Sequence, residues 1–461
     1  MSTTNPLSSL STSLGSTGSG TTSSTGLGQG INVQQFVQFA VANQQAVITS
    51  LQNQVTALGS QAGEITTITN DLNNLSSAAA ELNDPLGALA AESATSSDST
   101  IVNATASSTA AAGSHAITVA NLATTSSWYT KTEQPSSSTT LASGSFSISV
   151  GGAKAVQVTI DASDNTLTQL ASSINNQNLG VTASVIQDAN GYRLALVSSA
   201  SGAPGNIAIT NDTTGLNLQQ AVPGNNANLT VDGVPISSAS NTVTNVINGV
   251  TLNLGSTTTG DQQVSISVNP DTSQANTAIN NFVSAYNTVV TEINNQFHVA
   301  SDGTGGGPLE SDSSLREAQN LLLSAISYAI PGNNGIVNLA SIGVNLNNDG
   351  TLSVDNGTLN AALSSNYGAV QNLFQNATNG FSQNLSSAIN SITGPAGGIL
   401  TLDSQSVSST AQNITQQISD LQAALLVQEQ QLTTVYSKVN ATLQELPLLE
   451  NQVSQQLSSI A

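Results

Sequence analysis

The chain has 461 residues, of which only 7% are charged, and 26 acidic against five basic residues give it a formal net charge of −21 at pH 7. This length predicts two to four domains. The acidic excess disfavours nucleic acid and anionic membranes as partners, because affinity for phosphate comes mainly from Lys and Arg. Cysteine is absent, which excludes disulfide frameworks, zinc knuckles and thiol nucleophiles.

The N-terminal region begins with a polar segment and continues as a helix. Residues 1–25 consist of Ser, Thr and Gly with scattered Leu, and we expect them to be disordered. The first thirty residues also lack the basic and apolar segments of a cleavable secretory signal, and no stretch of the chain approaches 18 apolar residues, so we expect no membrane insertion. A helix is predicted to begin near Asn32, an acceptable N-cap, and to end at Asp84-Pro85.

The apolar residues of this first helix alternate at spacings of three and four, which indicates a heptad seam. One irregular step, at Ile65, should locally overwind the supercoil. The seam consists of Ile48, Leu51, Val55, Leu58, Ala62, Ile65, Ile68, Leu72, Leu75, Ala79 and Leu82.

A second seam lies at the C-terminal end, where apolar residues recur at intervals of seven. Pro447 interrupts this segment and is expected to kink the helix or split it in two, because proline lacks an N–H group. We expect the two seams to pair with each other or with copies of themselves, to be poorly ordered in the free monomer, and to pack only on assembly. The C-terminal seam consists of Ile418, Leu425, Leu432, Val439, Leu446, Val453 and Ile460, together with Leu421, Val435 and Leu449, which each follow one of them by three residues.

Between the terminal helices the apolar period changes to two, which predicts β-strands. Strands are expected at 116–122, 145–150 and 156–160, at 181–186 and 192–197 around an Asn190-Gly191 turn, and over 229–268 with Asp232-Gly233 as a turn. Helical spacing predicts helices at 167–175, 278–297 and 315–326, then a hairpin around Asp349-Gly350 and short helices to about residue 392. The order of helix, sheet and helix favours domains inserted into one another.

Two loop motifs superficially resemble ligand sites. The segment 26–30, Gly-Leu-Gly-Gln-Gly, has neither the preceding strand nor the spacing of a dinucleotide-binding loop, and we interpret it as a flexible hinge. The segment 345–350 resembles the start of an EF-hand loop, but Asn356 stands where a bidentate Glu is needed. A hairpin turn is the favoured interpretation of that segment.

Few side chains suggest chemistry or an exposed anchor. The two histidines, His115 and His298, lack partners at ligand spacing, and we expect no metal site, no cofactor and no enzyme activity. Trp128-Tyr129 is the only double aromatic and could anchor a protein or sugar partner on the surface. Packing beneath a loop is the favoured interpretation of this pair.

Seven segments stand out in order along the chain, namely residues 26–33, 113–123, 229–233, 249–254, 282–287, 307–316 and 342–352. Together they resemble members of the flagellar hook-associated protein 2 family, the filament cap proteins. Residues 167–199 are in addition similar to a repeat of flagellin and hook proteins. The C-terminal helix departs from the family, because residues 428–431, Tyr436 and Pro447 stand where members often carry a basic-aromatic cluster.

The resemblance implies an α+β multidomain fold with a coiled-coil-like leg of terminal helices, a helix-rich domain and two inserted β-rich domains. We therefore expect a disordered tail over 1–25 and a leg over 26–60 and 405–461. The helix-rich domain is expected over 61–98 and 272–404, a β-rich head domain over 99–128 and 226–271, and an inserted β-rich head domain with hairpins over 129–225.

The resemblance also implies a structural role at the distal end of the bacterial flagellar filament. The cap would form a homo-oligomeric ring and guide the insertion of exported flagellin. Its implied partners are further copies of itself, flagellin, the hook–filament junction proteins and an export chaperone. The implied location is extracellular, at the flagellum tip, after export through the flagellar type III apparatus without a cleaved signal peptide.

Two alternatives remain open. One is a flagellin-like or hook–filament junction axial protein, which would polymerise into long filaments. The other is a surface adhesin that serves cell attachment by binding glycans through Trp128-Tyr129. The low content of charges of either sign also favours an external medium of acidic pH, in which carboxylates become protonated and ion pairs dissolve.

Overall fold

The computed structural model describes residues 31–298 and 305–459. These residues fall into two compact units. Unit 1 contains the chain up to Asn70, Glu292–Ala318 and the chain from Ser391, and unit 2 contains Asp71–Thr291 and Gln319–Asn390. The tail expected over 1–25, the glycine-rich segment 26–30 and Ile460 lie outside the described residues.

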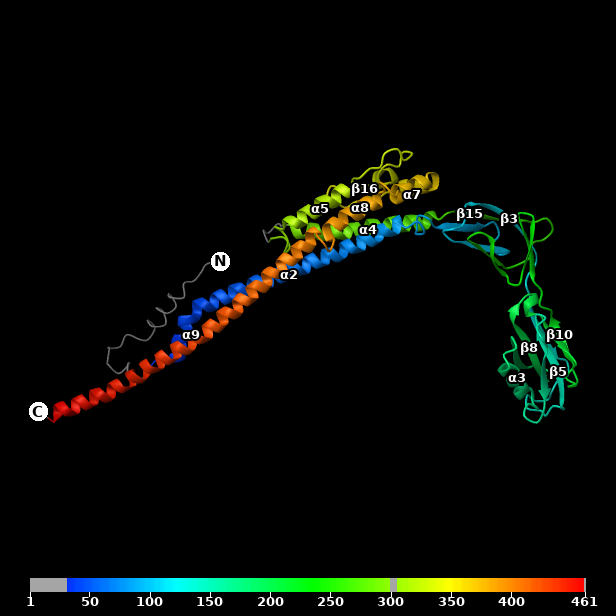
Figure 1. Ribbon diagram of the computed structural model, residues 1–461, viewed down its shortest axis with the longest axis horizontal. Coiled ribbons are helices and arrows are strands. Elements are labelled where there is room, and N and C mark those ends of the chain that lie inside the picture. Colours follow the sequence, from blue (N-terminus) through cyan, green and yellow to red (C-terminus); the bar gives the residue numbers. More distant parts are fainter. Residues whose placement is uncertain (1–30, 299–304, 460–461) are drawn as a thin grey trace. The chain divides into compact units, whose positions relative to one another are not determined.

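The first long helix, α2 (Val33–Asn83), has the ends that the sequence predicts. The Oδ1 atom of Asn32 accepts a hydrogen bond of 3.1 Å from the backbone N–H of Gln35, which confirms Asn32 as the N-terminal cap. The helix ends one residue before Asp84-Pro85, also as predicted. Figure 1 shows the N-terminal part of α2 beside the second long helix, α9 (Ile399–Ser458).

Helix α9 continues through Pro447 without a break, so the prediction of a split helix is wrong. A proline inside a helix removes one intrahelical hydrogen bond, here the one to the carbonyl of Leu443, and strains the turn before it. The flanking Gln444, Glu445 and Leu446 and the residues that follow are strong helix formers, so the helix resumes at once.

The segments 272–297 and 313–393 contain further helices and a small hairpin. The predicted helices at 278–297 and 315–326 are confirmed as α4 (Thr272–Phe297) and α5 (Ser313–Ile326). Helix α4 begins earlier than predicted because Oδ1 of Asp271 accepts hydrogen bonds from the N–H groups of Ser273 and Gln274. The remaining elements are the 3₁₀ helix η3 (Leu339–Ile342), β16 (Val344–Leu346), β17 (Leu352–Val354), α6 (Asn356–Ser365), α7 (Tyr367–Gln375) and α8 (Phe381–Thr393).

The hairpin around Asp349-Gly350 is confirmed in its register. Val344 pairs with Val354 and Leu346 pairs with Leu352. The segment that resembles the start of an EF-hand loop is therefore a hairpin turn.

The helical part of unit 2 has an aromatic core. The ring of Phe381 meets the rings of Phe282 and Phe374 edge to face, at centroid distances of 5.6 and 5.7 Å. Leu72 and Leu82 of α2 are also fully buried. The second half of α2 is thus part of a packed core within the single chain.

The first β-rich core lies between two antiparallel sheets with the strand orders β1-β15-β3-β11-β12 and β13-β14-β2. Its buried residues come from residues 101–123 and 227–268. The expected strand at 116–122 corresponds to β3, and the Asp232-Gly233 turn joins β11 to β12 as predicted. The strands are β1 (Glu92–Ser96), β2 (Val102–Ala106), β3 (Gly113–Asn121), β11 (Ala227–Val231), β12 (Val234–Ser238), β13 (Thr242–Ile247), β14 (Val250–Leu254) and β15 (Val264–Pro270).

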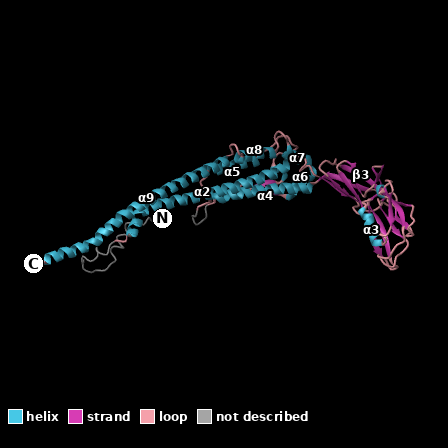
Figure 2. Ribbon diagram, turned by 60° about the horizontal axis from the view of Figure 1, so that its bottom comes forward, coloured by secondary structure: helices cyan, strands magenta, loops and turns pink. Residues whose placement is uncertain are grey.

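The second β-rich core is built from residues 141–216, which the chain inserts between β3 and β11. Its sheets have the orders β10-β4-β8-β7 and β6-β5-β9, and the helix α3 (Leu167–Asn176) contributes to the same core (Figure 2). The predicted Asn190-Gly191 hairpin is confirmed as β7 paired with β8. The elements are β4 (Thr125–Thr130), β5 (Gly144–Val150), β6 (Val156–Ile160), β7 (Val181–Gln187), β8 (Tyr192–Ser201), η2 (Ala203–Gly205), β9 (Ile207–Thr210) and β10 (Leu218–Val222).

Candidate assembly surface

The two terminal seams meet in unit 1 where α2 and α9 run side by side. Val41 and Ile48 of α2 and Leu425 of α9 are buried together. Ile418 and Leu432 pack against them. Within the chain, this part of each seam is therefore covered by the other.

Further contacts along the same pair show that the helices are antiparallel. The rings of Phe36 and Tyr436 lie 5.8 Å apart between centroids. The backbone N–H of Ile31 donates a hydrogen bond of 2.7 Å to Oδ1 of Asn440. Residues later in α9 thus contact residues earlier in α2. The last of these contacts joins Asn440 to Ile31, the first described residue of the chain.

The last turns of α9, residues 441–458, extend past the start of α2, and we call them the C-terminal extension. Its seam residues Leu446, Leu449 and Val453 are 47%, 53% and 53% exposed. Leu448 and Leu457 lie outside the seam and are exposed as well. The heptad pattern alone missed these two, although the apolar run around Pro447 could have indicated Leu448. The described part of the chain offers this extension no covering helix.

The predicted seam residues consequently have three different environments. The N-terminal seam from Ile65 to Leu82 is buried by the chain's own helical part, so the expectation that it stays unpacked in a single molecule is wrong for these residues. Helical segments distant in sequence supply the cover, which the spacing could not reveal. Buried are Ile48, Ile65, Leu72 and Leu425, half-buried are Leu51, Val55, Leu58, Ile418 and Leu432, and exposed are Val439, Leu446 and Val453.

Trp128 and Tyr129 lie on β4, a strand that the sequence did not predict, between β8 and β10. The indole of Trp128 packs against the second β-rich core, and its Nε1–H donates a hydrogen bond of 3.0 Å to the carbonyl of Ile207. The ring of Tyr129 lies 5.8 Å from the guanidinium of Arg193. The role of this pair as a surface anchor stays a prediction. The indole N–H of Trp128 is already used in the hydrogen bond to Ile207.

The histidines lie in ordinary surroundings. The Nδ1 atom of His115 lies 2.8 Å from Oδ2 of Asp232, and this contact holds the pKa of Asp232 below its usual range. His298 is exposed after the end of α4. Among the described residues, no group of three or more His, Asp or Glu side chains is arranged to hold a metal ion.

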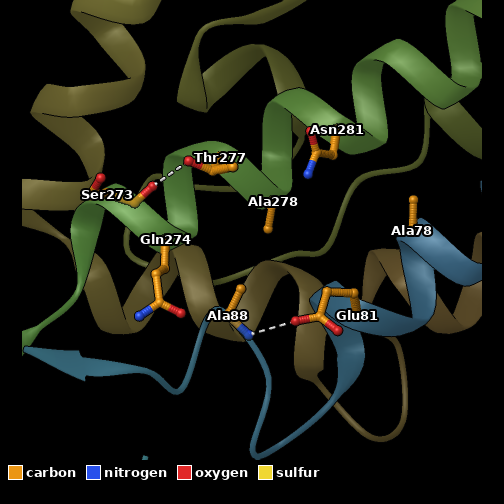
Figure 3. A pocket seen from close by; sticks show the side chains of 8 residues that line it. All are labelled: Ala78, Glu81, Ala88, Ser273, Gln274, Thr277, Ala278 and Asn281. Carbon is orange, nitrogen blue, oxygen red and sulfur yellow. Dashed lines mark hydrogen bonds between the residues drawn. The ribbon is translucent and has the colours of Figure 1, made fainter. Parts of the chain in front are cut away.

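A surface pocket of about 450 Å³ lies in unit 2 (Figure 3). The carboxylate of Glu81, which lines this pocket, accepts a hydrogen bond of 3.1 Å from the N–H of Ala88 and so closes the turn after α2. The hydroxyl of Thr277 donates to the carbonyl of Ser273 within α4. These groups serve the backbone and form no nucleophile–base pair. The lining residues are Ala78, Glu81, Ala88, Ser273, Gln274, Thr277, Ala278 and Asn281.

None of the described helices combines the length and the hydropathy that crossing a bilayer requires.

Comparison with protein families gives matches at both ends of the chain and in its middle. The family model for the N-terminus of flagellar hook-associated protein 2 matches residues 29–126. The family model for the C-terminus of flagellar hook-associated protein 2 matches residues 224–447. The flagellin hook IN motif matches residues 145–200, which lie in the second β-rich core.

Individual relatives agree with these matches. The chain is 30% identical over 399 residues to the B-type flagellar hook-associated protein 2 of Pseudomonas aeruginosa, covering 80% of this chain and 84% of that protein. It is 26% identical over 367 residues to flagellar hook-associated protein 2 of Escherichia coli, covering 74% of this chain and 77% of that protein. A crystal structure of three domains of the flagellar cap protein FliD from Escherichia coli matches with a TM-score of 0.58 at 28% identity, covering 75% of this chain and 99% of that chain.

The fold and the comparisons lead to one assignment. The α+β multidomain architecture with long terminal helices matches a solved cap protein over most of the chain. The resemblance seen in the sequence is confirmed at both ends and in the inserted motif. The chain belongs to the flagellar hook-associated protein 2 family, the structural proteins of the flagellar filament cap.

Proposed function

We propose that this protein caps the distal end of the flagellar filament as an oligomer and guides the insertion of flagellin, in a structural and non-catalytic role. The observation that carries the proposal is the C-terminal extension. Its seam residues Leu446, Leu449 and Val453 keep heptad spacing and stay exposed, although the earlier part of the same seam is covered by α2. A heptad seam without a partner is a surface for other helices.

The energy available at this surface is substantial. Burying one Leu or Val side chain contributes about 1.5–3 kcal/mol. The burial free energy of three seam side chains per copy therefore offsets part of the entropy lost when subunits associate. The extension carries Glu445 and Glu450 and no Lys or Arg, so its association with other helices rests on apolar contact.

The proposed partners and location follow from family membership. We propose a ring of copies of this chain at the flagellum tip, in contact with flagellin and with the hook–filament junction proteins during assembly. We further propose extracellular placement after export through the flagellar type III apparatus, with a chaperone that covers the C-terminal helix before export. An apolar helix end held in the cytoplasm needs such a cover.

We also propose the domain division expected from the sequence. The leg comprises residues 26–60 and 405–461, and the helix-rich domain comprises 61–98 and 272–404. The β-rich head domain comprises 99–128 and 226–271, with 129–225 inserted in it. Support comes from the two separate β-rich cores, whose buried residues lie at 101–123 with 227–268 and at 141–216.

Substitutions in the extension test the proposal. We expect the double variant Leu446→Ser/Leu449→Ser to form no oligomers, as measured by sedimentation velocity. The thermal unfolding of its monomer should be the same as that of the original monomer, because both side chains are exposed in the single chain. In a strain lacking the gene, this variant should fail to restore filaments and should release flagellin into the medium.

The matched control is Leu448→Ser, which removes a neighbouring leucine outside the seam that is even more exposed, at 66%. This variant should assemble and restore filaments. Normal rings and swimming with the double variant would contradict the proposal, and polymerisation of the original protein into long filaments would favour a flagellin-like axial protein instead.

A further inference from the structure

Acidic side chains of unit 1 have almost no cations to pair with. The described segments of this unit contain ten Asp and Glu residues but only two Arg or Lys residues, Arg316 and Lys438. Within the described part of the chain, no Lys, Arg or His forms a salt bridge with the four carboxyl groups considered next. Those four carboxyl groups lie in two pairs.

The first pair joins α2 to α4. Nε2 of Gln296 donates hydrogen bonds to Oε2 of Glu64, at 3.3 Å, and to Oε1 of Glu292, at 3.1 Å. Gln296 is 3% exposed, and its Oε1 accepts a hydrogen bond from the N–H of Leu309, which fixes the orientation of the amide. One amide nitrogen thus holds the carboxyl groups of Glu64 and Glu292 beside each other, and the nearness of Glu292 raises the pKa of Glu64.

The second pair joins α9 to the segment before α5. The carboxyl group of Asp312 lies close enough to that of Asp403 to raise the pKa of Asp403. Oδ1 of Asp312 accepts a hydrogen bond of 2.8 Å from the N–H of Leu315, so this side chain is held in place. Oδ2 of Asp403 is buried and has no hydrogen-bond partner in the described structure.

A proton stabilises each of these pairs. Two ionised carboxylates that lie side by side repel each other, and burial strengthens the repulsion. When one of them takes up a proton this repulsion ends, and its O–H group can donate a hydrogen bond to the other, since an ionised carboxylate is an acceptor only. Both pairs are therefore more stable when each holds a proton.

The charged groups around the pairs do not replace that proton. His298 follows α4 and is exposed, and the carboxylate of Glu310 accepts a hydrogen bond of 2.7 Å from the N–H of Gly306. Arg316 donates to the carbonyl of Glu310 at 2.8 Å and lies over the ring of Phe297 at 4.4 Å. Glu317, the remaining charged group of α5 in unit 1, adds further negative charge.

We propose that the two carboxyl pairs, Glu64 with Glu292 and Asp312 with Asp403, form a proton-dependent lock that joins α2, α4, α9 and the segment before α5. When each pair holds a proton, the pairs link these segments. When the pairs are fully ionised, their repulsion loosens unit 1.

The pH range of this lock follows from the shifted groups. Burial, and then the neighbouring carboxyl group of Asp312, raise the pKa of Asp403 to about 6 from an ordinary value of 3.8. Burial, and then Glu292, raise the pKa of Glu64. A carboxyl group whose pKa is raised by folding favours the folded state at low pH, and this contribution is lost as pH rises from about 4 through about 6.

Several aspartates of unit 2 respond in the opposite direction. Hydrogen bonds from the hydroxyl groups of Thr and Ser two or three residues away hold the pKa of Asp98, Asp161, Asp349 and Asp355 below the usual range. Their contribution is present above about pH 4 and is lost on acidification. Unit 1 should thus tighten at a mildly acidic pH that unit 2 still tolerates.

Thermal unfolding of the full chain tests the lock without reference to filament capping. Circular dichroism at 222 nm follows the helices, and the fluorescence of Trp128, the only tryptophan, follows the second β-rich core. We expect the helical transition to fall by several degrees between pH 5 and pH 7.5 and the Trp128 transition to change little. A helical transition that does not fall over this range would overturn the proposal.

The double variant Glu64→Gln/Asp403→Asn removes one ionisable group from each pair. Its helical transition should lie above that of the original protein at pH 7.5 and should lose most of its dependence on pH. The control Asp420→Asn, an exposed carboxylate of α9 that accepts a hydrogen bond from Gln416, should keep the original dependence. An unchanged pH dependence in the double variant would refute the lock.

A second measurement uses the unmodified protein and so does not depend on folding of the variants. Infrared spectroscopy at pH 5.5 should show a carbonyl band of protonated carboxylic acid that disappears by pH 7.5. Absence of this band at pH 5.5 would also overturn the proposal.

Discussion

Three hydroxyl groups in the helical part of unit 2, those of Tyr286, Tyr367 and Ser382, are buried and have no hydrogen-bond partner among the described residues. Tyr286 is fully buried on α4, the helix that also carries Phe282 of the aromatic core. Burial raises the pKa of Tyr286, so the phenol stays neutral. A buried polar atom without a partner costs free energy that a phenylalanine would not.

We therefore expect Tyr286→Phe to raise the free energy of unfolding by about 1 kcal/mol, measured by urea denaturation. The control Tyr286→Ala removes the whole ring and should lower that free energy by about 3 kcal/mol, because it leaves a cavity. A phenylalanine variant that is less stable than the original protein would show that the hydroxyl has a stabilising partner.

Arg193 illustrates how one residue can connect several elements. Its Nε donates to Oδ2 of Asp188 at 2.7 Å, and a second nitrogen pairs with Glu133. A third, Nη1, donates to the backbone carbonyls of Thr130 and Lys131. The planar group of five donors makes this combination possible, and the contacts join β8, the turn before it and the end of β4.

At the scale of elements, α9 combines a continuous helix with an internal proline. We expect Pro447→Ala to increase the helical signal at 222 nm and to slow hydrogen exchange in residues 441–458, because alanine restores the missing hydrogen bond. Proline is about 3 kcal/mol less favourable than alanine inside a helix. Gln444→Ala, an exposed substitution in the same turn, is the control and should change neither signal appreciably. Equal exchange in both variants would show that the proline does not limit this end of the helix.

At the scale of the whole molecule, the single chain packs some parts of its terminal helices and leaves others uncovered. We expect strong hydrogen-exchange protection of residues 65–82 in the monomer, because Ile65, Leu72 and Leu82 are buried. Residues 441–458 should exchange rapidly in the monomer and become protected on assembly. Strong protection of this extension in the free monomer would contradict the assembly surface, and weak protection of 65–82 would contradict the packed core.

The sequence by itself determined the elements and the family. The period of seven placed both terminal helices, and the period of two placed the hairpins at Asn190-Gly191, Asp232-Gly233 and Asp349-Gly350, because each signal lies in consecutive residues. The short strands β1, β2, β4, β9 and β10 escaped prediction, since their Ser, Thr, Ala and Gln residues alternate weakly and pairing with neighbouring strands stabilises them.

Only the tertiary structure decided which parts of the seams are covered and which carboxyl groups meet. Ile65 and Leu446 both belong to a heptad seam, yet one is buried and the other exposed, because cover comes from segments hundreds of residues away. Glu64 and Glu292 likewise carry no local sign of their contact. Period and propensity act between near neighbours in the chain, whereas burial and charge pairing depend on neighbours in space.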